Sequence, residues 1–487
     1  MKTFITKSVP IVIAIILSGL FWFISNGLNG DYWYLLWIAP VPVLLISLRT
    51  KAYQSFFMAF LAYLTGRFSW FGYLASVLAP VPAIILIIVL SLIFAAILVI
   101  TRSMILKTNY WFSVFAFPVF FTAFEWLLIN FSPDGSAASI AYSQSDFLPF
   151  IQIASFTGIL GITFIATLIP SAIAVGWYLR KEKMQLLPLS VTTIVVMVSV
   201  FLFGLVRISH GAKSDKLTAG LVVLDEDKHQ ISDPDFSREP EIAKIYTQEI
   251  GKLAVRGAKL VVLPERALNI NKDSDSAVME ILSSCAKQNH VYIVAGFTDY
   301  RSHKNRNSAL VIDGQGNLLL DYVKIHLIKV LEDQFTPGNK IGSFTFNGSR
   351  TGVAICKDLD FSDYIKQYGK EKVDFLCIPA WDFVVDDWLH SRMAILRGVE
   401  NGFSEVRTAR LGRLTITDPF GRVIAEANSS KGKTTVLIGQ VPMMRTDTFY
   451  ARHPDWFGFL ILSTAFVFII LILFKRKIQT KEIIQQP

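Results

Sequence analysis

The sequence predicts a multi-pass α-helical membrane domain joined to a single α/β sandwich domain. The 487 residues are 52% hydrophobic and only 17% charged, whereas ordinary soluble domains carry roughly 25% charged residues. The long uncharged runs are confined to residues 1–215 and 453–475, while residues 216–445 alternate short β-rich runs with amphipathic stretches. A wholly soluble protein is therefore excluded.

Eight apolar stretches approach the roughly 20 residues that a helix needs to cross a bilayer. The first has a basic flank and an apolar run, as a signal peptide does, but no small-residue cleavage site follows, so we expect a retained anchor. We expect a seven-span membrane domain over residues 1–215, a folded domain over 216–445, and a last span with a basic tail over 446–487. The expected spans lie near residues 8–25, 32–48, 54–75, 81–101, 110–130, 148–178, 187–207 and 455–474.

The charges of the short loops predict the orientation of these spans. If the chain crosses the membrane at every span, thirteen lysines and arginines fall on one side and none in the loops near 26–31, 76–80 and 131–147. Because positively charged loops stay in the cytoplasm, both termini are expected there and residues 216–445 on the extracytoplasmic side. The thirteen are Lys2, Lys7, Arg49, Lys51, Arg102, Lys107, Arg180, Lys181, Lys183, Lys475, Arg476, Lys477 and Lys481.

The distribution of charge and cysteine argues against several classes of function. Residues 216–445 contain 30 Lys and Arg against 29 Asp and Glu, so the net charge of +9 lies almost wholly in the apolar parts. A nucleic-acid-binding face would concentrate basic charge on the folded domain, so we expect no nucleic-acid partner. Cys285, Cys356 and Cys377 make neither a disulfide framework nor a Cys/His metal motif, and we expect no metal and no cofactor.

Short β-rich runs and amphipathic stretches alternate along residues 216–445, as in an α/β sandwich. The runs 313–316 and 418–421 combine Asp, Gly and Pro and predict hairpin turns. The expected strands lie at 217–224, 260–263, 291–297, 309–312, 351–355 and 375–378, and the expected helices at about 239–256, 275–288 and 385–400.

Three reactive side chains follow β-rich runs, where open α/β sheets commonly place their chemistry. Glu265 ends the run from Val261, Lys324 follows the run 318–323, and Cys356 ends the run from Gly352. A carboxylate can take the proton of an attacking thiol, and an ammonium can stabilise the thiolate and the tetrahedral oxyanion. Singly, each residue has a structural alternative, because a cysteine in a buried strand is usually core and a lone Glu or Lys usually ends a strand in solvent.

With their flanking residues these positions resemble the nitrilase, or carbon-nitrogen hydrolase, superfamily. The whole chain resembles its membrane branch, the apolipoprotein N-acyltransferase family, which implies eight membrane helices and a nitrilase-like α-β-β-α sandwich inserted before the last of them. The matching segments occur in the family's order at 125–126, 141–144, 151–154, 157–164, 264–268, 307–310, 324–327, 354–356, 397–402 and 418–423.

The resemblance implies that Glu265 is the general base, Lys324 the oxyanion-stabilising ammonium and Cys356 the nucleophile. Glu332 occupies the place of the family's second glutamate and would orient the lysine or the acceptor amine, although a solvated loop carboxylate is the alternative. Asp358 stands where a glutamate is usual, and a cap for the helix after the nucleophile is its structural alternative.

The resemblance also implies a reaction. The thiolate would take an acyl chain from a phospholipid, and the α-amine of a diacylglyceryl cysteine on a lipoprotein would accept it, at the extracytoplasmic face of a bacterial inner membrane. We expect a monomer. Trp381, Phe383 and Trp388 belong to an apolar stretch that either contacts the membrane or substrate or packs within the domain.

Several positions depart from the family's pattern, and they leave rival functions open. Lys357 replaces an aromatic residue, Arg410-Leu411-Gly412 replaces Asn-Thr-Gly, 225–230 lacks an aromatic block, and 328–332 lacks the usual Pro-Phe-Gly-Glu. Lys357 would be a second ammonium beside the thiol. The rivals are a membrane-tethered amidase, an acyltransferase with another amine acceptor, and a catalytically silent homologue that binds lipoprotein or lipid.

Overall fold

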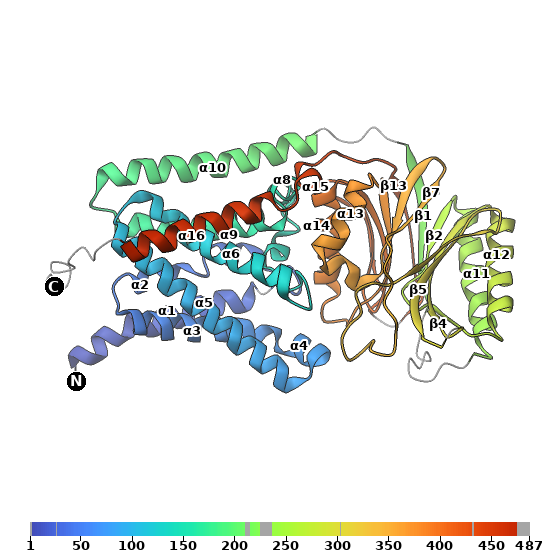
Figure 1. The fold of residues 1–487 in the computed structure, drawn as a ribbon, viewed down its shortest axis with the longest axis horizontal. Coiled ribbons are helices and arrows are strands. Elements are labelled where there is room, and N and C mark those ends of the chain that lie inside the picture. The colour runs from blue at the N-terminus through green and yellow to red at the C-terminus, as the bar shows by residue number, and fades with distance from the viewer. Residues whose placement is uncertain are drawn as a thin grey trace. The chain divides into compact units, whose positions relative to one another are not determined.

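The computed structural model describes residues 2–25, 27–209, 215–224, 236–301, 303–430 and 433–474. It divides the chain into two compact units, drawn together in Figure 1. The helical unit comprises Met1–Pro133, Ala138–Val206 and Pro454–Pro487, and the α/β unit comprises Asp134–Ala137 and Arg207–His453. The multi-pass helical region and the nitrilase-like α/β domain that the sequence predicts are both present.

Within the described residues, five helices of the helical unit are long and apolar enough to cross a membrane. They are α5 (Pro80–Thr108), η3 with α6 (Trp111–Phe115, Ala116–Phe131), α9 (Ile159–Tyr178), α10 (Lys183–Ser209) and α16 (Trp456–Phe474). The other helices of this unit are α1 (Lys2–Ile24), η1 (Trp33–Trp37), α2 (Val41–Ser47), α3 (Ala52–Arg67), η2 (Phe68–Trp70), α4 (Phe71–Leu78), η4 (Ile140–Gln144), α7 (Leu148–Ile151) and α8 (Ala154–Thr157).

Three of the expected spans are broken into shorter pieces. The stretch 148–178 breaks at Gly158, whose φ of 70° no helix interior adopts, so that only α9 reaches spanning length. In the stretch 32–48 one short helix ends at Trp37 and the next begins after Pro40. In the stretch 54–75 the α-helix gives way to a 3₁₀ turn at Phe68. Apolar composition does not distinguish one long helix from two short ones.

Aromatic packing joins α1, α3 and α5. The ring of Trp22 meets Tyr63 edge-on at 5.1 Å, and Tyr63 stacks on Phe94 at 4.3 Å between centroids. A Cβ at Gly66 would lie 2.3 Å from the Cβ of Trp22, so glycine permits this close approach. The buried carboxylate of Glu125 on α6 accepts hydrogen bonds from Ser139 Oγ, Ile140 N and Thr163 Oγ1, an arrangement that holds the helices together.

The α/β unit is built on two sheets. The first has seven strands in the order β13-β1-β2-β4-β5-β6, with β3 paired to β4, and the second has six in the order β12-β11-β10-β9-β8-β7. The strands are β1 (Lys216–Val223), β2 (Leu260–Val262), β3 (Leu268–Ile270), β4 (Tyr292–Asp299), β5 (Arg306–Ile312), β6 (Leu318–Val323), β7 (Gly342–Phe346), β8 (Ser349–Val353), β9 (Phe375–Trp381), β10 (Ser404–Arg410), β11 (Arg413–Thr417), β12 (Val423–Asn428) and β13 (Thr435–Pro442).

Helices cover the outer faces of both sheets and complete the α-β-β-α sandwich, as Figure 1 shows. Apolar residues of β1, β2, β8, β9 and β10 form one core between the sheets, and a second core lies under α11 and α12. The predicted strands and helices are present, with no end shifted by more than three residues. The helices are α11 (Glu239–Val255), α12 (Asp275–Asn289), η5 (Cys356–Asp360), α13 (Ser362–Lys370), α14 (Asp387–Asn401) and α15 (Phe449–Arg452).

Candidate active site

The three candidate catalytic residues lie just beyond the carboxyl ends of β2, β6 and β8. Glu265 follows β2, and Gly296 of β4 lets its loop approach, because a Cβ there would lie 2.3 Å from the Pro264 carbonyl oxygen. Lys324 directly follows β6. Cys356 opens η5 with a φ of +43°, a left-handed conformation that a residue with a side chain seldom adopts. Such backbone strain is typical of functional positions.

Lys324 lies between two carboxylates in the interior. Its Nζ donates to Glu265 Oε1 at 2.7 Å and to Glu332 Oε2 at 2.8 Å, and the lysine is fully buried. Asn307 Nδ2 donates to the same two carboxylates, at 2.6 and 2.7 Å. Glu332 also accepts the backbone N–H of Ile328 at 2.8 Å. A solvated loop carboxylate is therefore the wrong description of Glu332, which is 4% exposed.

The two glutamates differ in their pKa although both contact the same ammonium. Burial raises the pKa of Glu265 above its usual value, against the opposing effect of Lys324. Burial acts the same way on Glu332, but the ammonium and the hydrogen bonds from Ile328 and Asn307 outweigh it and lower its pKa. Because environments that push two pKa values apart assign acid–base roles, Glu332 is the permanent anion and Glu265 is suited to accept a proton.

Burial lowers the pKa of the Lys324 ammonium, but Glu265, Glu332 and the Cys356 sulfur outweigh it, so the pKa is raised well above its usual value. Lys324 is therefore a fixed positive charge. Burial and the Glu265 carboxylate raise the pKa of the Cys356 thiol well above its usual value, against the effect of Lys324. The resting thiol is protonated and needs a base to become a nucleophile.

Asp358 connects the loop after Lys324 to the turn that carries Cys356. Its Oδ1 accepts from the backbone of Ile325 and His326 at 3.2 and 2.9 Å, and its Oδ2 accepts from Tyr322 Oη at 2.7 Å and Ile355 N at 3.0 Å. The bond to Ile355 has the form of a helix cap. The other bonds show that the buried carboxylate does more than cap: it fixes the two candidate catalytic segments to one another.

Both units of the chain are similar to known protein families. A model described as the apolipoprotein N-acyltransferase N-terminal domain matches residues 18–172, and one for the carbon-nitrogen hydrolase domain matches residues 230–450. An apolipoprotein N-acyltransferase of Geobacter metallireducens is 24% identical over 481 residues, covering 91% of each chain. The chain is a divergent member of the apolipoprotein N-acyltransferase family.

Two further similarities concern the α/β unit. A 2-oxoglutaramate amidase of Bacillus subtilis is 27% identical over 216 residues, which cover 42% of this chain and 81% of that protein. A solved amidase from Nesterenkonia sp. superposes with a TM-score of 0.42 at 15% identity, covering 50% of this chain and 98% of that one.

Lys357, which replaces an aromatic residue of the apolipoprotein N-acyltransferase family, is held by carboxylates. Its Nζ lies 2.6 Å from Asp134 Oδ1 and 3.9 Å from Asp360 Oδ2. The buried ammonium is therefore paired with carboxylates, and its expected effect on the adjacent thiol stays a prediction. Asp134 comes from the segment 134–137, whose Ser136 also donates from its N and Oγ to the Asp360 carbonyl oxygen at 2.9 and 2.6 Å.

The apolar stretch after β9 is divided between surface and interior. Trp381 is partly exposed and its carbonyl oxygen lies 3.4 Å from Cys356 Sγ, so it borders the candidate nucleophile directly. Phe383 is partly exposed, with its backbone N–H bonded to Asp386 Oδ1. Trp388, 4% exposed, packs inside the domain under the guanidinium of Arg392. The packing alternative therefore describes Trp388, and contact with a substrate remains a prediction for Trp381 and Phe383.

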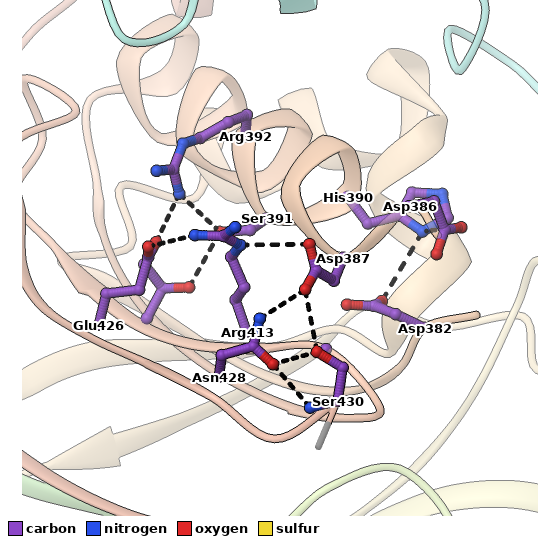
Figure 2. A network of polar contacts seen from close by, with 12 residues as sticks. Asp382, Asp386, Asp387, His390, Ser391, Arg392, Arg413, Glu426, Asn428 and Ser430 are labelled. Atoms are coloured by element: carbon purple, nitrogen blue, oxygen red, sulfur yellow. Dashed lines mark hydrogen bonds and ion pairs between the residues drawn. The ribbon is translucent and has the colours of Figure 1, made fainter. Parts of the chain in front are cut away.

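A polar network fixes the segment that follows Trp381, as Figure 2 shows for Asp382, Asp386 and His390. Arg407 binds both oxygens of Asp382, at 2.6 and 3.1 Å, and His390 Nδ1 lies 2.9 Å from Asp386 Oδ2. Burial lowers the pKa of His390, but Asp386, Asp382 and Asp360 outweigh it and raise the pKa well above its usual value. In the same figure Arg413 joins Asp387 to Glu426 and so anchors the start of α14 to β11 and β12.

Sequence reasoning did not identify Asn307, Asp382 or Arg407 as parts of the site. Asn307 lies on β5 with polar neighbours, and the pattern of a strand does not tell which of its polar residues faces a buried charge. Asp382 lies in an apolar stretch, and a carboxylate in such a stretch indicates that it is buried with a partner. The sequence does not tell which residue the partner is. The part of the chain that the structure describes holds no group of three or more His, Cys, Asp or Glu suited to a metal.

Proposed function

We propose that this protein is an N-acyltransferase that moves an acyl chain from a phospholipid, through a thioester on Cys356, to the α-amine of the lipid-modified N-terminal cysteine of lipoproteins. The single observation that supports it best is the buried contact of Lys324 with Glu265 and Glu332 beside a strained cysteine. The presence of both family domains on one chain supports the lipid substrates.

In the first half-reaction the Glu265 carboxylate takes the thiol proton while Cys356 Sγ attacks the ester carbonyl carbon. The carbonyl oxygen becomes an oxyanion, and the fixed charge of Lys324 stabilises it. The ester C–O bond then breaks, and Glu265 returns the proton to the leaving oxygen. The products are a lysophospholipid and the acyl thioester.

In the second half-reaction the amine attacks the thioester carbonyl through an oxyanion at the same position. Glu265 takes a proton from the amine, the C–S bond breaks, and the departing thiolate regains a proton. The pKa directions suit this sequence, since the raised pKa of Glu265 lets it hold a proton transiently while Glu332 stays ionised and keeps Lys324 in place.

We further propose that the α/β unit lies on the extracytoplasmic side of a bacterial inner membrane and acts as a monomer. Membrane-spanning helices on both sides of the unit along the chain would keep the site near the bilayer, where the lipid donor and the lipid-anchored acceptor both reside.

The test uses the purified full-length protein with phospholipid carrying a labelled acyl chain and a diacylated lipopeptide. The proposal predicts labelled lipopeptide with three acyl chains, formed together with lysophospholipid. Release of labelled fatty acid without peptide acylation would instead show that water is the acceptor. Recovery of unchanged phospholipid would contradict any acyl transfer from this donor and leave the silent, lipid- or lipoprotein-binding homologue.

A nitrilase-type amidase is the second candidate, and the similarity of the α/β unit to a 2-oxoglutaramate amidase favours it. The same Glu265, Lys324 and Cys356 would then cleave an amide and pass the acyl group to water. Ammonia release from short amides, measured with the same preparation, would distinguish this activity. An acyltransferase with another amine acceptor would label that amine in place of the lipopeptide.

A further inference from the structure

Two arginines lie against the tryptophan that borders the nucleophile. Arg266 directly follows Glu265 and has a φ of +52°, and Arg410 is the last residue of β10. Both are more than nine-tenths buried, at 8% and 4% exposure. Long cationic side chains are rarely placed so deep without a specific role.

The guanidinium groups occupy defined positions around Trp381. The Cζ atom of Arg410 lies 4.4 Å from the ring centroid of Trp381, and that of Arg266 lies 5.6 Å from it. Arg410 Nη2 donates to the backbone carbonyl oxygen of Arg266 at 3.1 Å, which ties the two residues together. Trp381 therefore contacts the cationic pair through its ring, and its carbonyl oxygen lies 3.4 Å from Cys356 Sγ.

Neutral groups position the Arg266 side chain. Its Nε donates to Thr298 Oγ1 at 3.0 Å, and its Cζ lies 4.9 Å from the ring centroid of the buried Phe335. The Tyr300 side chain hydrogen-bonds with the same guanidinium, and the charges of Glu265 and Glu332 act on it. These contacts hold the planar group in one orientation, and such a group can bind an oxyanion through two parallel hydrogen bonds.

Burial and mutual repulsion make the two positive charges unfavourable, and a bound anion would offset both effects. Burial lowers the pKa of Arg266, Glu265 and Glu332 counteract it, and the charge of Arg410 lowers it further. Like charges close together in a desolvated site repel one another. A phosphate or carboxylate bound by both groups would turn that repulsion into attraction.

We propose that Arg266 and Arg410 form a subsite for an anionic group of the acyl donor, a phosphate or a carboxylate, next to Trp381. This inference rests on the proposed function and deepens it, since it names the part of the donor that these two residues recognise. A glycerophospholipid offers such a group, because only the glycerol unit separates its phosphate from the acyl ester carbonyl. A small amide with a terminal carboxylate offers the same chemistry from another source.

The experiment measures acyl-enzyme formation at Cys356 by the full-length protein in detergent. One pair of donors is phosphatidic acid and a diacylglycerol with the same acyl chains, which differ in the phosphate. A second pair is succinamate and butyramide, which differ in the carboxylate. The variants are Arg410→Gln, Arg266→Gln and Arg410→Lys, and the control is Arg350→Gln, which alters an exposed arginine paired with Glu371.

The inference predicts that the wild type prefers each anionic donor over its neutral counterpart by about tenfold or more. Arg410→Gln and Arg266→Gln should each bring the ratio of the anionic-donor rate to the neutral-donor rate to about one, Arg410→Lys should retain part of the preference, and Arg350→Gln should not change the ratio. Misfolding would slow both donors of a pair equally, so the ratio of the two rates separates loss of recognition from loss of structure.

Each remaining outcome is decisive. A wild type that reacts with lipids but shows no preference for either anion overturns the subsite and leaves the proposed function standing. Variants that slow both donors of a pair equally overturn it too, since they give the arginines a structural role. If no lipid acylates Cys356 but succinamate reacts faster than butyramide, the proposed function fails and the subsite stands as that of an amidase.

Discussion

At the scale of single residues, the central feature is one ammonium shared by two carboxylates with different chemistry. Lys324 contacts Glu265 and Glu332 at nearly the same distance, 2.7 and 2.8 Å. Glu332 also receives a backbone N–H, from Ile328, and this bond helps keep it ionised. The two pKa values therefore differ because burial dominates at Glu265, where the charge of Glu332 adds to it, whereas at Glu332 Lys324 and the hydrogen bonds from Ile328 and Asn307 outweigh burial.

A comparison of two lysines tests the assignment of the oxyanion stabiliser. Lys324→Met keeps the length of the side chain and deletes the charge, so acyl-enzyme formation should slow roughly a hundred- to thousand-fold, as for loss of one oxyanion-hole donor. Lys357→Met should slow it far less, because the Lys357 ammonium pairs with Asp134. Single-turnover acylation measures both. A larger defect in Lys357→Met would mean that the triad lysine has been misassigned.

Much of the site could be predicted at this scale, and the remainder has a physical reason. Glu265, Lys324 and Cys356 each follow a β-rich run, and the structure brings the first two into direct contact. Arg410 was visible only as a departure from a family pattern, because its stacking on Trp381 depends on the parallel pairing of β9 with β10, whose register the sequence does not show. Which residues of a strand face a buried charge depends on tertiary packing, which a single sequence does not encode locally.

At the scale of elements, β10 carries a buried acid that couples stability to pH. Glu405 is 1% exposed, and burial raises its pKa to about 8, against the effect of Arg407. A carboxyl group whose folded pKa lies above its unfolded value of 4.5 contributes stability that is fully present below pH 4.5 and is lost as the pH rises through the folded pKa of about 8. The limiting slope for one proton is about 1.4 kcal/mol per pH unit.

Glu405→Gln should remove this dependence. The neutral amide keeps the size of the side chain and can still accept the N–H of Gly398, so the variant should gain stability relative to the wild type at pH about 8 and little at pH about 5. Thermal unfolding of both proteins at the two pH values measures the difference. An equal difference at both values would show that Glu405 does not titrate in this range.

Several strands of the α/β unit were not predicted from the sequence pattern. The period-two runs located the principal strands, whereas β3, β7 and β10–β13 were not expected. In β10 and β11 the charged residues Arg407 and Arg413 interrupt the apolar pattern. These arginines form ion pairs with carboxylates of other elements, as Arg413 does with Asp387 and Glu426. Ion pairs of this kind permit charged residues in a sheet, and local periodicity does not reveal the partners that satisfy them.

At the scale of the whole molecule, the two units interleave along the chain. Residues 134–137 lie in the sequence between α6 and η4, yet they belong to the α/β unit, where Arg397 Nη2 donates to Ser136 Oγ at 2.6 Å. Gly135 has a φ of +53°, and a Cβ there would lie 2.4 Å from the Asp360 carbonyl oxygen. The composition of a short polar loop does not show which unit it packs against. The expected domain boundary at residue 215 therefore left residues 134–137 in the membrane domain.

The orientation of the molecule in the membrane remains a prediction from the thirteen cationic loop residues. A reporter enzyme that is active only outside the cytoplasm should be active when fused after Gly316 and silent when fused after Lys481. Comparable expression of the two fusions is the control. The opposite pattern would place the α/β unit in the cytoplasm, away from lipoprotein acceptors of the extracytoplasmic face.

The central claim is that Cys356 carries the acyl group, and intact-mass measurement of the full-length protein tests it most directly. After incubation with phospholipid, the wild type should gain the mass of one acyl chain, and adding diacylated lipopeptide should remove it. Cys285→Ala and Cys377→Ala should retain the adduct, because burial raises the pKa of both thiols, to about 11 for Cys285, and only Cys356 of the three is acted on by Glu265 and Lys324. Cys356→Ala should show no adduct. An undiminished acyl adduct on Cys356→Ala would contradict the account.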